Sequence, residues 1–549
     1  MGFFSRKSSD FPTDNAILPS RSPISSMTDS EGPPPIAQIF KLPPEILQQI
    51  LSYLDVQHLV SLFRVCRDLK IHAEEDRLWI DLLKPHIPHY DFHNSPHPAP
   101  SFCNLYLTHH PYWFLPRHKI WFSDDAYNGK LILIKFDAQK GSIEGYQLTA
   151  ERPRAHAEAW SYKPSVIIHH INPRVYASTE DPVLSLPYST KPHHRGTSAW
   201  IRSNGGSSEG QFGAWSLSNE PHMLVGRANQ KINASLLLSR NLPLPTSNAL
   251  SVSVWPPRTI PDMPRVRSSN SSSDKFASRG HRPNTLEEIS QTTFRLRTWS
   301  HFMQGMAALG VRIGEEVSTW STLSEDLYKP TKEKPYQGIF VGDYASHGCE
   351  FLLVLQTEQA PDRRARTVPN QDQEDTERDR PSNYIRAVLA ALRDELVSED
   401  ELEEMADQGH MTVDVKGAVH VQAPRVEPNV SDGNGDYVVH KGAIEAIKLT
   451  GDVNVPRGEH TFIADDIGPA GTIRIAHERP FRGARVVRSR GHVAARGFRN
   501  DEFVPSQLFL VSPDLLAQYW LPFGHISFYK RIDIDELLQA ATNNRSACE

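Results

Sequence analysis

The chain has 549 residues, a length typical of two or three domains. Its 59 basic and 65 acidic side chains give a net charge of −6, which argues against nucleic-acid and anionic-membrane partners. Four cysteines without a CxxC pair indicate a reducing compartment, so we expect a cytoplasmic or nuclear location. We expect no secretory signal and no membrane-spanning helix, because no run approaches the ~20 apolar residues that a span needs.

The N-terminal region divides into two parts. Residues 1–37 are rich in Ser, Pro and Asp, and we expect a disordered arm there. Residues 38–83 carry apolar side chains at helical spacing, and we expect three short helices with Trp79 closing the run. Two prolines at the start of the first helix and an aspartate before the second are typical of helix N-termini. A unit this small cannot bury all its apolar surface alone, so we expect it to need a partner surface.

Within this region, residues 42–79 read LPPEILQQILSYLDVQHLVSLFRVCRDLKIHAEEDRLW. The Leu-Pro opening, the Val-Cys-Arg in the middle and the Leu-Trp at the close resemble an F-box. The resemblance implies docking to Skp1 and, through Skp1, to a cullin–RING ubiquitin ligase. The positions that match the family's contact residues are Leu42, Pro43, Ile46, Ile50, Leu51, Leu54, Leu59, Val65 and Cys66. The alternative is an ordinary helical hairpin whose apolar residues are all internal core.

The rest of the chain changes character after a connector. Residues 84–116 combine short helices with a stretch rich in Pro and His. Lys130–Phe136 and Ile143–Leu148 then predict a β-hairpin. Many similar short runs, separated by Gly, Pro, Asp or Asn, predict one large β-rich domain over 117–535. The expected fold class is therefore α+β, with an N-terminal helical F-box and a mostly antiparallel barrel or sandwich-like domain.

Several segments interrupt the β-rich region. We expect flexible or disordered insertions near 256–284, 358–384 and 408–436, because these segments have no apolar period. A helix is expected at 385–406 and another at Asp533–Ala540, with residues 536–549 forming a C-terminal tail. The absence of a fixed repeat argues against WD40 and leucine-rich receptors. Whether residues 117–335 are a separate domain is left open by the sequence.

Four motifs stand out in the β-rich region. They are QGIFVGDYASHGCEF (337–351), AIKLTGDVNVPRGEHT (446–461), GHVAARGF (491–498) and QLFLVSPDLLAQYWLPFGHISFYKR (507–531). In this order they resemble the C-terminal domain of the F-box-only protein thirty-one family and its fungal relatives. The resemblance implies a substrate receptor whose β domain binds C-terminal tails, including those of cyclin D and of proteins ending in an amide. Ala345, Ser346 and Arg496 depart from the family's pattern, so substrate identity is not carried over.

These motifs supply candidate substrate-binding residues. An amide terminus offers two donors and one acceptor, which Asp452 with Asn454 could read, whereas Asp452 would repel a carboxylate. The alternative is that both residues close their own turn. His347 and Glu350 are further candidates, and the alternative for them is a structural His–carboxylate bond. The predicted substrate-binding set is Tyr344, His347, Glu350, Asp452, Asn454 and Trp520.

Catalytic signatures are missing from the sequence. The 25 histidines include a group in the connector, but no HExxH or paired cysteines accompany them, so we expect no metal site. GxSxG, P-loop and GxGxxG motifs are also absent, and we expect no cofactor. The sequence therefore predicts a non-catalytic adaptor that brings protein substrates to a ubiquitin ligase. Two alternatives are a scaffold that turns over no substrate and a β-barrel small-ligand binder or hydrolase with an appended F-box.

Overall fold

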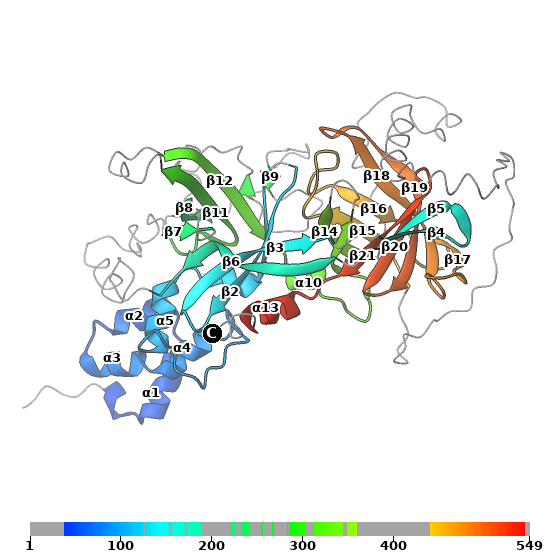
Figure 1. Cartoon of the computed structure of the whole chain (residues 1–549). Helices are drawn as coiled ribbons and strands as arrows, with labels where there is room; N and C mark the ends of the chain where they lie inside the picture. The colour runs from blue at the N-terminus through cyan, green and yellow to red at the C-terminus, as the bar shows by residue number, and fades with distance from the viewer. Residues whose placement is uncertain are drawn as a thin grey trace, which may run out of the picture.

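A computed structural model of the chain places a helical module at one end, a first curled sheet in the middle and a barrel at the other end (Figure 1). The described residues are 38–125, 127–152, 156–170, 173–188, 221–226, 232–240, 254–255, 266–267, 283, 285–301, 312–343, 348–358 and 440–543. Within this part of the chain, no helix is long and apolar enough to cross a membrane.

The helical module contains four α-helices. It consists of η1 (Gln38–Lys41), α1 (Pro44–Leu51), α2 (Val56–Leu62), α3 (Arg67–Ala73) and α4 (Asp76–Leu83). Pro44 occupies the first helical position of α1, where a missing N–H has no cost. Asp55 caps α2 by accepting a hydrogen bond from the backbone nitrogen of His58 at 2.9 Å. Trp79 lies inside α4 and donates from Nε1 to the Ala73 carbonyl at 2.8 Å. The sequence predicted three helices ending near Trp79, and the fourth helix carries that residue into the core.

The module continues into the first sheet without a break in the core. The connector supplies α5 (Phe102–His109) and α6 (Phe114–His118). Ring centroids lie 5.4 Å apart for Trp79 and Tyr106, and 6.1 Å apart for Tyr106 and Trp113. Trp113 in turn lies 5.5 Å from Phe136 on the first sheet. One apolar cluster contains side chains from both the helical module and this sheet. Because protein interiors are close-packed, the two form one rigid unit.

The first sheet has eight antiparallel strands. They are β1 (Ile120–Ser123), β2 (Leu131–Asp137), β3 (Ser142–Glu151), β6 (Arg174–Leu186), β7 (His222–Val225), β8 (Ile232–Arg240), β11 (Ile289–His301) and β12 (Arg312–Thr322). Their order is β6-β3-β2-β1-β12-β11-β8-β7. The two edge strands approach each other, because the Gly226 nitrogen donates to the Pro182 carbonyl at 3.2 Å. The sheet therefore curls around an apolar cluster to which all eight strands contribute.

The second sheet closes into a barrel, which we call the C-terminal barrel. Its strands are β13 (Gly338–Asp343), β14 (Cys349–Thr357), β15 (Ala443–Lys448), β16 (His460–Ala464), β18 (Arg485–Ala495), β19 (Arg499–Ser512), β20 (Leu515–Trp520) and β21 (His525–Arg531). Each strand pairs antiparallel with the next, and β13 also pairs with β21, with Gly342 opposite Tyr529. An apolar cluster with members from all eight strands fills the inside.

The two sheets cannot be separated into independent domains. The hairpin of β4 (His156–Trp160) and β5 (Lys163–His170) comes from the first half of the chain, yet β5 pairs with β21 in parallel. A second apolar cluster joins outer faces of both sheets, with Phe122 and Leu133 from one and Leu353 and Leu449 from the other. Residues 117–335 are therefore structurally continuous with the barrel, which answers the question that the sequence left open.

The expected α+β fold class is confirmed, namely an N-terminal helical region followed by a large antiparallel β region with barrel-like sheets. The start of the GHVAARGF motif lies within β18, which runs without interruption from Arg485 to Ala495. The insertions near 256–284, 358–384 and 408–436 and the helix at 385–406 lie outside the described residues, apart from β10 (Val266–Arg267), which pairs with β9 (Val254–Trp255).

Three short elements complete the fold. β17 (Thr472–Ile475) pairs with β18 at the outside of the barrel. α10 (Glu325–Tyr328) precedes the barrel, and α13 (Ile534–Asn543) follows it. The expected helix at Asp533–Ala540 is thus present, and it includes the start of the segment 536–549 that we expected as a tail. Figure 1 shows α13 lying beside β2 and β6 rather than extending away from the molecule.

Candidate functional site

An uncovered apolar face lies on α1. Leu42, Ile46, Ile50 and Tyr53 follow one another at helical spacing, and we call them the Ile46 face. All four are exposed, with 44% of Ile46 and 80% of Tyr53 accessible to solvent. Val65, which precedes α3, is 64% exposed. Because apolar side chains gathered at one surface mark an interaction site in soluble proteins, this face is the first candidate site.

The other predicted Skp1 contacts lie deeper. Leu51 and Leu59 are buried in the module's own core, while Leu54 and Cys66 are half-buried. The Cys66 sulfur caps α3, accepting from the Leu69 nitrogen at 3.4 Å. Pro43 is exposed next to Leu42. The role of all nine residues at a Skp1 contact remains a prediction, and the exposed members are the ones that offer free apolar surface.

A second candidate lies at one end of the C-terminal barrel. Because neighbouring strands are antiparallel, the connections at 449–459, 496–498 and 521–524 lie at the same end as the start of β14. We call it the Asp452 end. Four of the predicted substrate-binding residues that the structure describes, Glu350, Asp452, Asn454 and Trp520, lie in or beside these connections. Tyr344 and His347 lie outside the described residues.

Asp452 and Asn454 both have hydrogen-bond partners inside the protein: Asp452 bonds in its own turn and to β15, and the Asn454 side chain bonds to β18. One Asp452 oxygen accepts from the nitrogens of Asn454 at 2.5 Å and Val455 at 2.9 Å. The other accepts from Lys448 Nζ at 2.8 Å. The Asn454 side chain donates to the Ala494 carbonyl at 3.1 Å. These contacts agree with the alternative for Asp452, which closes its own turn, and any contact of either residue with a substrate remains a prediction.

Glu350 is the acidic group with spare hydrogen-bonding capacity. It points into the barrel, two residues before Leu352, and is only 2% exposed. Lys448 Nζ lies 2.7 Å from one of its oxygens, so one ammonium serves both Glu350 and Asp452. Among the described residues, neither Glu350 oxygen has a hydrogen-bond donor in good geometry. Two buried carboxylates thus share one cation, and Glu350 is the less well satisfied.

This arrangement shifts the two acids in opposite directions. Burial raises the pKa of Glu350 to about 8, against the opposing effect of Lys448. Asp452 is also buried, but the charge and hydrogen bond of Lys448 outweigh that burial and lower its pKa to about 2. Glu350 can therefore hold a proton near neutral pH while Asp452 remains ionised.

A pH-dependent stability follows from Glu350. Between its ordinary pKa of 4.5 and about 8, the folded chain keeps a proton that the unfolded chain has released. The free energy of unfolding therefore falls as pH rises through this interval. We expect Glu350→Gln to abolish this pH dependence. The free energy of unfolding of the variant, relative to that of the wild type, should therefore rise by at least about 1 kcal/mol between about pH 5 and about pH 8. Chemical denaturation at both pH values measures this, and parallel pH profiles would contradict it.

Polar side chains continue along the inside of the barrel. Tyr529 donates to Gln518 at 3.0 Å, and Gln518 donates to Ser506 at 3.2 Å. The Ser506 and Ser489 hydroxyls lie 2.7 Å apart. Beside this chain, Trp520 is buried, and its Nε1 has no partner among the described residues. The barrel core is therefore apolar in its middle and polar toward the Asp452 end.

Glycine makes room for the Trp520 indole. A Cβ on Gly491 would overlap the Trp520 ring and lie 2.8 Å from Gln518 Nε2. The GHVAARGF motif thus begins with a residue whose missing side chain admits an aromatic ring, and the sequence alone could not assign that role.

The motif at 446–461 also fixes the barrel to the first sheet. Arg457 donates to the carbonyls of Asp124 and Asp125, and its backbone nitrogen donates to the Tyr127 carbonyl at 2.8 Å. The Gly451 nitrogen donates to the Asn128 carbonyl at 2.7 Å. Part of this motif therefore has an internal structural role, and the sequence reading missed both Arg457 and Lys448. The sequence does contain a signal for Lys448. Side chains two residues apart on a strand share a face, so Lys448 takes the inward position that follows Ile444 and Ala446.

Metal and histidine chemistry receive no geometric support. Across the residues that the structure describes, no three His, Cys, Asp or Glu side chains are placed to hold a metal ion. His86 and His110 of the connector are buried, and burial lowers their pKa values to about 4 and about 3. They are neutral packing groups at physiological pH.

Two known families match separate parts of the chain, one the helical module and one the C-terminal barrel. Residues 39–84 match the family described as F-box-like, and this segment spans the helical module. Residues 320–536 match the family described as the Cyclin D1 binding domain, and this segment includes all eight strands of the C-terminal barrel. A search of curated proteins gave no match. Residues 39–84 are thus similar to the F-box-like family, and the C-terminal barrel is similar to the Cyclin D1 binding domain family.

Proposed function

We propose that the chain is the substrate-recognition subunit of a Skp1–cullin–F-box ubiquitin ligase. The observation that carries the proposal is the uncovered Ile46 face on a module that matches the F-box-like family. In this role the module docks Skp1, and Skp1 links the chain to a cullin–RING ligase. The aromatic core between α4 and β2 joins the docking module to the first sheet, and a shared apolar cluster together with the β5–β21 pairing joins that sheet to the receptor barrel. The chain itself performs no chemistry and raises the effective concentration of its target near the charged ubiquitin.

The Asp452 end is the proposed receptor surface for protein substrates, as in the F-box-only protein thirty-one family. The match of residues 320–536 to a family named for binding cyclin D1 supports a protein ligand. Glu350 supports a tail that ends in a hydrogen-bond donor, because Lys448 is its one nearby cation and neither of its oxygens has a well-placed donor among the described residues. A carboxylate terminus would meet the ionised Asp452 with like charge. The proposed ligand class is therefore a C-terminal tail with a neutral, amide-like end.

A paired peptide set tests this specificity. Each peptide is made once with a C-terminal amide and once with a free acid, and binding to the full chain is followed by fluorescence polarisation. We expect the best amide peptide to bind at least about tenfold more tightly than its acid, about 1.4 kcal/mol. Glu350→Ala should remove the difference, and Glu358→Ala, at the far end of β14, should preserve it. Equal affinity of amide and acid for the wild type would reject an amide-reading site.

Two other functions remain as outcomes of experiment. A scaffold without turnover would bind Skp1, yet deleting it would change no protein's half-life. A small-ligand binder or hydrolase would bind a metabolite in the barrel, and the polar chain from Tyr529 to Ser489 is the feature that favours such a ligand. Both are less well supported than a receptor, because neither explains the match to a protein-binding family. In the proposed function the chain works in the cytoplasm or nucleus and needs no membrane, nucleic acid or cofactor.

A further inference from the structure

Lys119 lies where the helical connector meets the first sheet. It follows α6 and directly precedes β1, and its carbonyl accepts from the Ile134 nitrogen at 2.6 Å. Its backbone has a φ of 61°, in the region that residues other than glycine rarely adopt. Its side chain is only 9% exposed. A strained backbone beside a buried charge indicates that the direction of this side chain matters.

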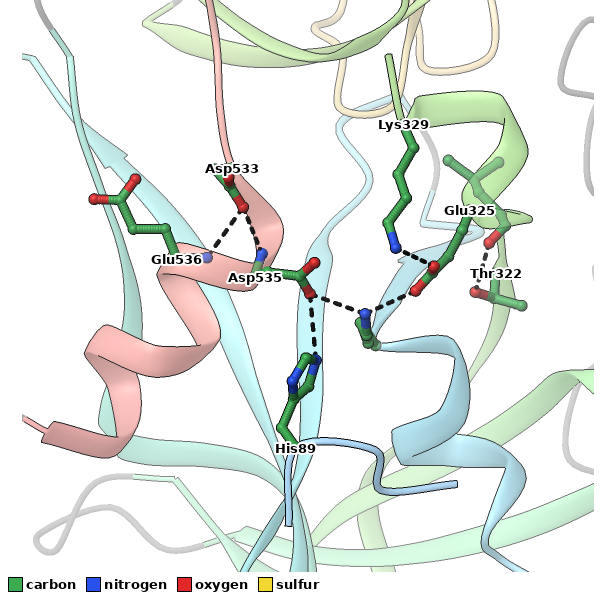
Figure 2. Close-up of polar contacts among 9 residues, drawn as sticks. His89, Thr322, Glu325, Lys329, Asp533, Asp535 and Glu536 are labelled. Carbon is green, nitrogen blue, oxygen red and sulfur yellow. Dashed lines mark hydrogen bonds and ion pairs between the residues drawn. The ribbon is translucent and has the colours of Figure 1, made fainter. Parts of the chain in front are cut away.

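Two carboxylates from distant parts of the chain meet at the Lys119 ammonium. Glu325 of α10 lies 2.8 Å from Nζ, and Asp535 of α13 lies 2.9 Å from it. Figure 2 shows Glu325 and Asp535 approaching a common point from two different helices. Burial alone would lower the pKa of Lys119, but its hydrogen bonds to Asp535 and Glu325 raise it. The ammonium therefore stays charged and holds both acids.

The partners have few substitutes for Lys119. Glu325 also pairs with Lys329, but that contact stays within α10 and joins nothing else. Besides Lys119, the basic side chain near Asp535 among the described residues is His89. Its Nε2 lies 3.9 Å from Asp535 Oδ1, and its side chain is mostly exposed (Figure 2). Asp533 caps the start of α13 by accepting from the backbone nitrogens of Asp535 and Glu536, which fixes where Asp535 points. In the described part of the chain, Lys119 is thus the cation that bridges these elements.

The three elements that meet at Lys119 belong to different parts of the molecule. α6 belongs to the core that includes the F-box module. α10 leads into β13 and packs near it through Leu327 and Tyr328. α13 follows β21 of the barrel and packs against both sheets through Ile534, Leu537 and Leu538. A single buried ammonium therefore joins the docking module to the elements that enter and leave the receptor barrel.

We propose that Lys119 is a positioning residue for ubiquitin transfer, fixing the direction of the receptor barrel relative to the Skp1-docking module. The proposal rests on the proposed function, because an adaptor without chemistry acts only through the geometry with which it presents its target. Loss of the bridge leaves both binding surfaces intact, since the Ile46 face and the Asp452 end contain none of its residues. The apolar cluster and the β5–β21 pairing still join the two sheets, but the angle between the barrel and the docking module is held less tightly, so that fewer encounters place a target lysine at the charged ubiquitin.

The test compares Lys119→Met with Lys329→Met in the full chain bound to Skp1. Lys329 is the matched control, because it pairs with the same Glu325 without bridging elements. Ubiquitin transfer is measured on a lysine-bearing amidated peptide from the paired set. We expect Lys119→Met to lower kcat about tenfold, with KM and the Kd for Skp1 unchanged. Lys119→Arg should restore kcat, and Asp535→Asn should reproduce the loss.

Small-angle scattering of the same complexes keeps this test separate from the proposed function. We expect a broader distance distribution for Lys119→Met than for the wild type and Lys329→Met. If the wild type transfers no ubiquitin, the proposed function fails, and the scattering alone decides on the bridge. Unchanged scattering, a raised KM, a kcat equal to that of Lys329→Met, or failure of Lys119→Arg to restore kcat would each overturn the proposal.

Discussion

Ile46→Glu combined with Ile50→Glu is expected to weaken Skp1 binding at least about 100-fold. Both side chains are exposed on α1 and offer aliphatic surface to a partner. Burying such a side chain contributes about 1.5–3 kcal/mol, and each 1.4 kcal/mol is tenfold in affinity. The two substitutions also place two charges in an apolar contact, which adds a desolvation cost. Isothermal titration of the full chain with purified Skp1 measures the effect.

The control for this prediction is Leu224→Glu. Leu224 is also an exposed aliphatic side chain, at 56%, but it lies on β7 of the first sheet rather than in the helical module. We expect its Skp1 affinity to stay within about twofold of the wild type, and circular dichroism should show all variants folded. If the Ile46 and Ile50 variant kept its Skp1 affinity, the uncovered face would need another partner, and the ligase role would lose its main support.

Lys448→Met is expected to destabilise the chain by about 3–5 kcal/mol, the usual cost of removing one partner from a buried ion pair. The substitution leaves Glu350 and Asp452 buried without their shared cation. Part of the cost is relieved when Glu350 takes up a proton, so the loss should be larger at high pH than at low pH. Urea denaturation followed by tryptophan fluorescence measures the free energy of unfolding.

Two further variants separate charge from packing in this prediction. Lys441→Met makes the same change at an exposed position near the start of β15, and we expect it to change stability by less than about 0.5 kcal/mol. Adding Glu350→Gln and Asp452→Asn to Lys448→Met should recover much of the loss, because the uncompensated charges are then gone. A Lys448→Met variant as stable as Lys441→Met would show that the buried cluster carries no stability.

Much of the fold was predictable because its signals are local. A short apolar run such as Lys130–Phe136, bounded by turn residues, predicted strand β2, because runs of this length and composition are typical of buried strands. Helical spacing likewise predicted α1. The spacing could not say which side of α1 faces inward: Leu51 lies in the module's own core, whereas Ile46 and Ile50 are exposed.

The non-local features were beyond such signals. Pairing of β13 with β21 closes the barrel across nearly two hundred residues, and β5 joins the same strand from the first half of the chain. The sharing of Lys448 between Glu350 and Asp452 depends on the pairing of β14 with β15 across a long insertion, and the contact of Lys119 with Asp535 joins positions 416 residues apart. Motif resemblance marked Glu350 and Asp452 as candidates, but only the structure separates the acid with free acceptors from the acid that closes its own turn.

The receptor role is tested most directly by proximity labelling in cells with and without an inhibitor of cullin neddylation. The labelling enzyme is fused to the wild type, to the Ile46 and Ile50 variant, and to Glu350→Ala. We predict that proteins labelled by the wild type accumulate when the ligase is inhibited. The Ile46 and Ile50 variant should label the same proteins, but their abundance should not respond to the inhibitor. The Glu350→Ala variant should no longer label them. The account would be contradicted if the abundance and half-life of the labelled proteins changed with neither the inhibitor nor the variants.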